Sequence, residues 1–282
     1  MNGENKMIGI IGGDMRFVYL AKMLCDDGFE VCVYGQGDKT PDCAVRCVSV
    51  DDSMNCCDLI VLPLPFTRDG KNINAPFFDE KIPIAGLTAR KSLSPCIAGG
   101  MLGEYANERG WVDYFDEEMM IKNALPSAEG AIMLALEHMP STLCKSSAFV
   151  IGYGRIGKLL ASKLKALGAS VTVFARKPAD RAYARAMLAE SADITALRAE
   201  LPFADVVFNT VPAELLERED IEAMKPTAVF IELASVACCD SEKIIKAPSL
   251  PSRCAPVSAA EYIRDSLYDM IAAGKIKGRR RR

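Results

Sequence analysis

Apolar runs and amphipathic stretches alternate along the chain and predict strands and helices in regular succession. In the second half, an apolar run at 148–151 precedes a glycine turn, and the next stretch carries apolar side chains at helical spacing. A second apolar strand follows Gly168. This order predicts a βαβ unit, which further elements extend into a parallel sheet. The further elements expected there are a helix at 179–189 and strands at 205–209, 229–233 and 243–247.

The first half repeats this rhythm and predicts a second parallel sheet. A helix is expected at 17–24, and strands are expected at 7–11, 30–34, 45–50, 59–62, 81–85 and 110–115. The fold class is therefore α/β and two-lobed, with a flavodoxin-like N-terminal domain over 1–126 and an NAD(P)-binding Rossmann domain over 127–257.

Two long amphipathic stretches connect these predicted domains. Pro126 and Pro140 set the limits of a helix at 127–139, whose buried stripe should comprise Ile132, Met133, Leu136 and Met139. A last helix at 258–273 has a capping box, Ser258 and Glu261. We expect this helix to return to the first domain, which residues 258–275 complete. The two helices would then form a hinge beside a substrate cleft, and 276–282 would be a basic tail.

The glycine turn carries the strongest chemical signal. Its spacing is that of the dinucleotide fingerprint, in which the glycines allow a tight bend, a close approach of backbone to pyrophosphate, and close packing of helix on strand. The helix that follows directs free N–H groups at the phosphates. The predicted cofactor-binding residues here are Gly152, Tyr153, Gly154, Arg155, Ile156 and Gly157.

The end of the next strand indicates which dinucleotide is bound. An NAD site usually has a carboxylate there, whereas this chain has Ala175 followed by Arg176 and Lys177. A guanidinium suits a 2′-phosphate, so NADP(H) is predicted, with NAD as the alternative. Two later strand-end loops should lie near the nicotinamide. They contribute Thr210, Val211, Pro212 and Ala234.

Composition narrows the class of protein. The net charge of −3 gives no reason to expect nucleic acid, and we expect no membrane span, no signal peptide and a cytoplasmic location. The 11 cysteines show no CxxC spacing, so we expect reduced thiols and no metal. The single histidine, His138, is expected at a helix end, as a surface residue rather than a catalytic base.

The whole pattern resembles the A subunit of bacterial dipicolinate synthase. The segments that carry the resemblance are IIGGDMR at 10–16, VLPLP at 61–65, NALPSAEGAIM at 123–133, the glycine turn with Ala175-Arg176-Lys177, and NTVPA at 209–213. The chain departs from the family pattern at 236–239 and 250–260, near the expected nicotinamide pocket.

The resemblance implies a sporulation enzyme of the mother-cell cytoplasm. It would oxidise a dihydrodipicolinate-level precursor to pyridine-2,6-dicarboxylate, as an oligomer with a flavoprotein-like B subunit, or as a homo-oligomer in isolation. The dicarboxylate substrate needs cationic and hydroxyl partners, so we expect Arg16 to bind one carboxylate and Thr67 or Ser127 the other. Asn123 and Ser127 would border the cleft, and Glu129 is the candidate proton acceptor.

Two alternatives remain at this point. A D-2-hydroxyacid dehydrogenase shares the two-lobed plan, but such enzymes use a histidine before the last helix, where this chain has Cys254-Ala255-Pro256. The other alternative is a regulatory protein that binds NADP(H) without catalysing a reaction.

Overall fold

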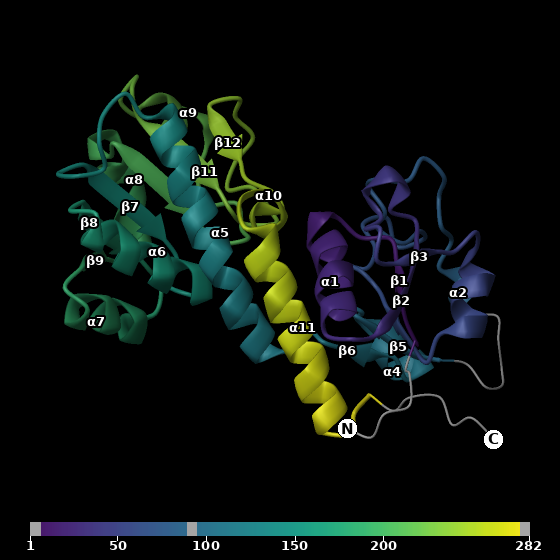
Figure 1. Ribbon diagram of the computed structural model, residues 1–282. Helices are drawn as coiled ribbons and strands as arrows, with labels where there is room; N and C mark the ends of the chain where they lie inside the picture. The colour runs from purple at the N-terminus through teal and green to yellow at the C-terminus, as the bar shows by residue number, and fades with distance from the viewer. Residues whose placement is uncertain (1–6, 89–94, 277–282) are drawn as a thin grey trace. The chain divides into compact units, whose positions relative to one another are not determined.

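The computed structural model describes residues 7–88 and 95–276, and Figure 1 labels its elements. The chain divides into two compact units: one holds the residues up to Met120 and those from Ala255 onward, and the other runs from Ile121 to Cys254. Within the described residues each unit is built on a parallel six-stranded sheet, which confirms the predicted α/β class. The predicted basic tail at 276–282 lies outside the described residues from 277 onward.

The first unit has the strand order β3-β2-β1-β4-β5-β6. This is the doubly wound order, and without the two-residue β3 it is the flavodoxin order. Its strands are β1 (Met7–Ile11), β2 (Glu30–Tyr34), β3 (Val45–Arg46), β4 (Leu59–Val61), β5 (Cys96–Gly99) and β6 (Val112–Asp113). Its helices are α1 (Met15–Asp26), η1 (Gly37–Lys39), α2 (Val50–Cys56), α3 (Ala85–Thr88), α4 (Glu104–Arg109) and α11 (Pro256–Ala272).

The C-terminal helix α11 belongs to the first unit, as predicted. Its residues Ile263 and Leu267 are buried in the same cluster as Phe17 and Leu20 of α1, on one face of the sheet. Ser266 Oγ also donates a hydrogen bond to the carbonyl oxygen of Tyr114, at 3.1 Å. The last helix therefore completes a core that the first 120 residues leave open.

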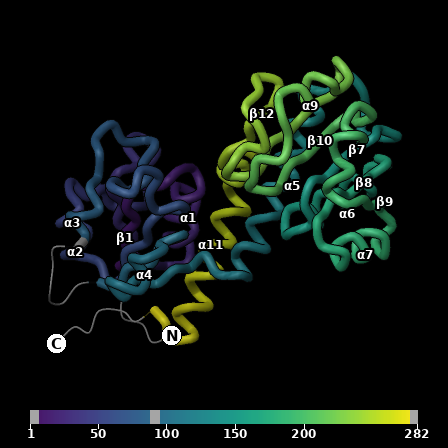
Figure 2. Tube along the Cα trace, turned by 180° about the vertical axis from the view of Figure 1, so that it is seen from behind, coloured from purple at the N-terminus to yellow at the C-terminus, as the bar shows by residue number. Residues whose placement is uncertain are grey.

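The second unit has the strand order β12-β11-β10-β7-β8-β9, and Figure 2 shows β10, β7, β8 and β9 side by side. Its strands are β7 (Ser147–Ile151), β8 (Ser170–Phe174), β9 (Glu190–Ala192), β10 (Val206–Asn209), β11 (Val229–Glu232) and β12 (Ile244–Lys246). Its helices are α6 (Arg155–Ala166), α7 (Pro178–Ala186), η2 (Ile194–Ala196), α8 (Leu197–Glu200), η3 (Leu201–Phe203), α9 (Arg218–Glu222) and α10 (Leu250–Cys254). Helix α5 (Glu117–His138) begins in the first unit and continues into the second.

Helix α5 corrects two predictions. It begins at Glu117 rather than after Pro126, which lies inside it. Proline removes one helical hydrogen bond but does not have to end a helix that packing holds in place. Met133 and Leu136, predicted to be buried, are 37% and 52% exposed.

The buried face of α5 is instead lined mainly by small residues. Ala128, Ala131 and Ala135 are fully buried, and Ile132 is nearly so. Alanine spacing is a weak hydrophobic signal, because the larger side chains of Met133 and Leu136 dominate the sequence pattern. The short side chains let the helix approach its sheet closely.

Three smaller expectations were also wrong. The strand at 45–50 is only β3, because Val50 begins α2. No strand forms at 81–85, a described segment that contains Pro83, which has no N–H to donate to a sheet. Helix α11 begins at Pro256 with Ala255 as N-cap, so the Ser258 capping box does not form. Within the described residues, none of the helices has the length and apolar character needed to span a membrane.

Candidate functional site

The glycine turn between β7 and α6 is shaped by contacts that leave no room for side chains. Gly152 has a φ of +92°, and a Cβ there would lie 2.5 Å from Thr210 Oγ1. A Cβ on Gly157 would lie 2.3 Å from the carbonyl oxygen of Gly152. Both positions therefore require glycine, one for the bend and the other for close packing of α6 against the turn.

Gly154 differs from these two glycines, because a Cβ there would meet no atom within 4 Å. It is the N-cap of α6, and no side chain caps this helix end. The open space and the uncapped helix end suit a bound anion, which the helix dipole also favours. The turn therefore fits the pyrophosphate of a dinucleotide.

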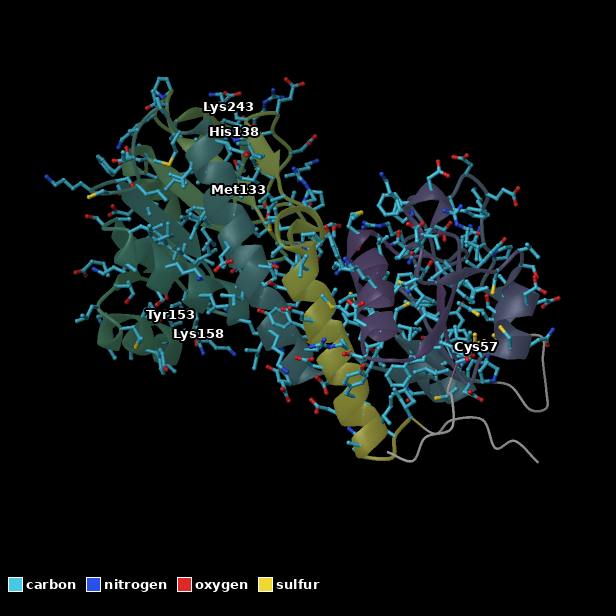
Figure 3. The ribbon with its side chains drawn as sticks, viewed as in Figure 1. Cys57, Met133, His138, Tyr153, Lys158 and Lys243 are labelled. Carbon is cyan, nitrogen blue, oxygen red and sulfur yellow. The ribbon has the colours of Figure 1, made fainter. Side chains whose placement is uncertain are left out.

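Tyr153 contributes its backbone to the turn, while its side chain packs inward. The ring is 6% exposed, and its centroid lies 6.2 Å from that of Tyr183 on α7. Figure 3 labels Tyr153 and Lys158, whose Nζ lies 5.9 Å from the Tyr153 ring centroid. Burial raises the pKa of Tyr153, so its hydroxyl is neutral at physiological pH.

The loop after β8 presents two cations to solvent. Ala175 is buried, whereas Arg176 and Lys177 are exposed. Sequence reasoning missed Arg181, whose Nη1 donates to the carbonyl oxygens of Ala175 and Arg176, each at 2.8 Å. The same nitrogen reaches Asp193 Oδ2 at 2.7 Å. Arg181 thus fixes the loop that carries Arg176.

Glu232, at the end of β11, is a second residue that sequence reasoning missed. It is 3% exposed and accepts hydrogen bonds from Asn209 Nδ2 and from the N–H groups of Ala234 and Cys238. Asn209 in turn binds both backbone polar groups of Val211. One carboxylate therefore organises the two strand-end loops that contain the predicted Val211, Pro212 and Ala234. A lone acidic residue at the end of an apolar strand was the available signal.

Thr210 supports the glycine turn through its side chain. Thr210 Oγ1 donates to the carbonyl oxygen of Ile151 at 2.8 Å, and it is the atom that a Cβ on Gly152 would meet. The Rossmann crevice opens where the strand order reverses, here between β7 and β10. The glycine turn and Thr210 flank this point.

Arg16 of the first unit is buried, at 4% exposure. Its Nε and Nη2 bind the two carboxylate oxygens of Asp14 at 2.9 and 2.8 Å, and Nη2 also donates to the carbonyl oxygen of Leu64. Asp14 is the N-cap of α1, and its side chain accepts a hydrogen bond from the Arg16 N–H. Arg16 thereby connects the loops that follow β1 and β4. The strand order of this sheet reverses between these two strands.

The other predicted residues occupy varied environments. Thr67 lies in an exposed turn and accepts from the Gly70 N–H. Asn123 and Ser127 are on α5, where Ser127 Oγ donates to the Asn123 carbonyl. Asn123 Oδ1 is buried and has no hydrogen-bond partner among the described residues. Glu129 forms a surface ion pair with Lys163 at 2.8 Å.

His138 is exposed at the end of α5, where its Nδ1 lies 2.8 Å from the carbonyl oxygen of Leu134. This is the surface position expected from the sequence.

Comparisons with known proteins find a matching family model in each unit. Residues 7–109 match the model for the N-terminal domain of the dipicolinate synthase A subunit, and residues 128–249 match the NAD-binding domain of D-isomer specific 2-hydroxyacid dehydrogenases. The dipicolinate synthase A subunit of Bacillus subtilis (strain 168) is 27% identical, over 94% of this chain and 95% of that protein. Over nearly its whole length the chain is similar to dipicolinate synthase A subunits.

Solved structures of two dipicolinate synthase A subunits are also similar to this chain. That of Bacillus halodurans superposes with a TM-score of 0.82 at 26% identity, covering 95% of this chain and 98% of the other. That of Bacillus subtilis gives 0.80 at 26% identity, covering 96% and 97%. The chain thus combines the N-terminal domain of this family with an NAD-binding dehydrogenase domain, and the latter indicates a nicotinamide cofactor.

Proposed function

We propose that this chain is the oxidoreductase component that forms dipicolinate from a dihydrodipicolinate-level intermediate, with NADP⁺ as hydride acceptor. The observation that carries the proposal is the uncapped, glycine-bordered start of α6 in a chain similar to dipicolinate synthase A subunits. A bound nicotinamide would supply the hydride-accepting ring. Oxidation of a dihydropyridine yields an aromatic product, so positioning matters more here than a strong base.

The preference for NADP⁺ rests on the loop after β8. Arg176 and Lys177 are exposed there, and the strand end lacks the carboxylate that usually accepts from a ribose 2′-hydroxyl. A guanidinium can form an ion pair with a 2′-phosphate and donate hydrogen bonds to two of its oxygens. Because Arg181 holds the backbone of this loop, Arg176 would not need to order the loop upon binding.

In the first unit, the substrate dicarboxylate is assigned to Arg16, with Thr67 as a further polar partner. Asn123 and Ser127 of α5 stay predicted substrate contacts. Asp14 occupies the Nε–Nη2 edge of Arg16. A substrate carboxylate would therefore use the remaining edge of the guanidinium. The ion pair fixes the arginine in one orientation, which lowers the entropy cost of binding.

Glu129 stays a prediction as proton acceptor. It is exposed and forms an ion pair with Lys163, so it can be reached from solvent. Replacement by Gln removes the base but keeps the side chain's shape. We expect Glu129→Gln to lower kcat with little change in KM for NADP⁺, and an unchanged kcat would remove Glu129 from the mechanism.

We further propose a partner and a location. The Bacillus subtilis relative is named as one lettered component of dipicolinate synthase, which implies a second component. We propose that the partner is a flavoprotein-like B subunit and that the chain forms homo-oligomers in its absence. We propose the mother-cell cytoplasm of a sporulating bacterium as its location.

The decisive experiment mixes the purified chain with lysine-pathway dihydrodipicolinate and NADP⁺, with and without the B subunit. Formation of the pyridine product is followed by its ultraviolet absorbance, and NADPH formation is followed separately. We expect equal amounts of both products. Tight NADP(H) binding without turnover, even with the B subunit present, would instead identify a regulatory protein.

A further inference from the structure

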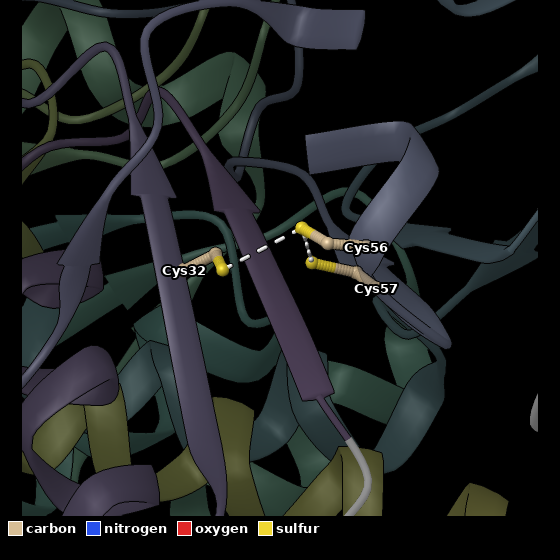
Figure 4. Close-up of side chains that lie close together, drawn as sticks. All are labelled: Cys32, Cys56 and Cys57. Carbon is tan, nitrogen blue, oxygen red and sulfur yellow. Dashed lines mark hydrogen bonds between the residues drawn. The ribbon is translucent and has the colours of Figure 1, made fainter. Parts of the chain in front are cut away.

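Three cysteines of the first unit form a cluster that the sequence does not reveal. Cys32 lies in β2, Cys56 is the last residue of α2, and Cys57 follows it directly. Cys56 Sγ lies 3.7 Å from Cys32 Sγ and 3.5 Å from Cys57 Sγ, and all three sulfurs lie within 4.8 Å of one another (Figure 4). Segments 24 residues apart in sequence therefore converge on one point.

A missing side chain makes room for this cluster. Gly9 of β1 pairs with Cys32 on one side and with Ile60 on the other. A Cβ on Gly9 would lie 2.8 Å from Cys57 Sγ. The sulfur of Cys57 thus occupies space over β1 that any other residue at position 9 would fill.

Two further sulfur-containing side chains contact this cluster. Met7 Sδ lies 3.4 Å from Cys32 Sγ, and the half-buried Cys47 interacts with both Cys32 and Cys56. The cluster lies near the amino ends of β1 and β4, because Met7 starts one strand and Cys57 precedes the other by two residues. The ligand-binding loops of a parallel sheet lie at the opposite, carboxyl ends. The cluster is therefore separate from the Arg16 region.

We propose that Cys32, Cys56 and Cys57 form a binding site for one thiophilic metal ion, and that this ion is Zn²⁺. Four zinc–sulfur bonds of about 2.3 Å in a tetrahedron separate the sulfurs by roughly 3.8 Å. The distances from Cys56 Sγ to Cys32 Sγ and to Cys57 Sγ approach this value. Cys47 or a solvent molecule reaching the exposed Cys56 completes the shell. Binding ties β2 to the junction of α2 and β4 and releases the thiol protons.

The test uses the full chain, freed of metal by a chelator and kept reduced. Co²⁺ is added first, because thiolate coordination gives a near-ultraviolet charge-transfer band and tetrahedral geometry gives intense visible bands. Zn²⁺ is then titrated to displace it. We expect one Co²⁺ per chain with both bands, complete displacement by one equivalent of Zn²⁺, and a higher Tm with Zn²⁺ than without.

Cys56→Ser is the test variant, because Cys56 is exposed and its replacement leaves the core intact. Cys144→Ser removes an exposed cysteine of the other unit and is the matched control. We expect Cys56→Ser to weaken Zn²⁺ binding at least 100-fold and to abolish the Zn²⁺-dependent rise in Tm, whereas the control should match the parent. Absence of the charge-transfer band in the parent, or equal Zn²⁺ affinity of both variants, would overturn the proposal.

Discussion

Asn209 Nδ2 lies between the two carboxylate oxygens of Glu232, at 2.9 and 3.0 Å, and both residues are buried. The amide thereby joins the ends of β10 and β11. The remaining acceptor capacity of the carboxylate binds two backbone N–H groups in the loop after β11. A buried carboxyl group is tolerated here because hydrogen bonds satisfy both of its oxygens.

Replacing Glu232 by Gln should destabilise the second unit. A Gln side chain offers one acceptor oxygen and turns donor hydrogens toward the N–H of Ala234 or Cys238. We expect a loss of about 1–3 kcal/mol in the free energy of unfolding, the cost of an unsatisfied buried polar group. Urea denaturation measures this loss. Glu222→Gln, at an exposed pair with Arg218, is the control and should change stability by less than about 0.5 kcal/mol.

Two glycines of the turn should respond differently to alanine. Gly154→Ala places its methyl in open space, so the chain should fold normally, but the methyl would keep pyrophosphate from the backbone. We expect a rise in the NADP⁺ Kd of at least 10-fold with Tm unchanged. Gly157→Ala should lower both affinity and Tm, because its methyl meets the Gly152 carbonyl. Calorimetric titration and thermal unfolding separate these effects, and normal NADP⁺ affinity of Gly154→Ala would refute the proposed cofactor position.

The choice between NADP and NAD can be tested at Arg176. Arg176→Asp replaces an exposed cation by the carboxylate typical of NAD sites. We expect it to weaken NADPH binding far more than NADH binding, by about 10- to 100-fold for a lost charge-assisted contact. Fluorescence titration of both nucleotides checks this, with Arg218→Asp on α9 as the control. Equal effects on the two nucleotides would contradict the assignment.

Asp205 should contribute to the acid sensitivity of the second unit. Burial alone would raise the pKa of this carboxyl, but hydrogen bonds from Lys225 Nζ and the Ser147 N–H hold it below its ordinary value. A folded-state pKa below that of the unfolded chain gives stability that is present above the unfolded pKa. This stability is lost as pH falls through the folded pKa.

Asp205→Asn should therefore lower stability at pH 7 and reduce its decline in acid. Urea unfolding at several pH values between neutral and strongly acidic checks both effects. Parallel pH profiles for parent and variant would show that Asp205 does not contribute.

The sequence by itself determined much of the fold. The apolar runs at β1, β2 and β7 and the helix α6 have the predicted positions, because buried parallel strands and glycine turns leave strong local signals. The glycine spacing also predicted the uncapped start of α6. The family resemblance is likewise a property of the sequence, carried by short segments such as IIGGDMR and NALPSAEGAIM.

Only the tertiary structure decided the rest. Pro126 lies within α5 and alanines line its buried face, because packing against a sheet outweighs local propensity. The contacts of Glu232 with Asn209, and of Cys32 with Cys56, join residues on separate elements. Such contacts depend on strand order and register, which spacing along the chain does not encode.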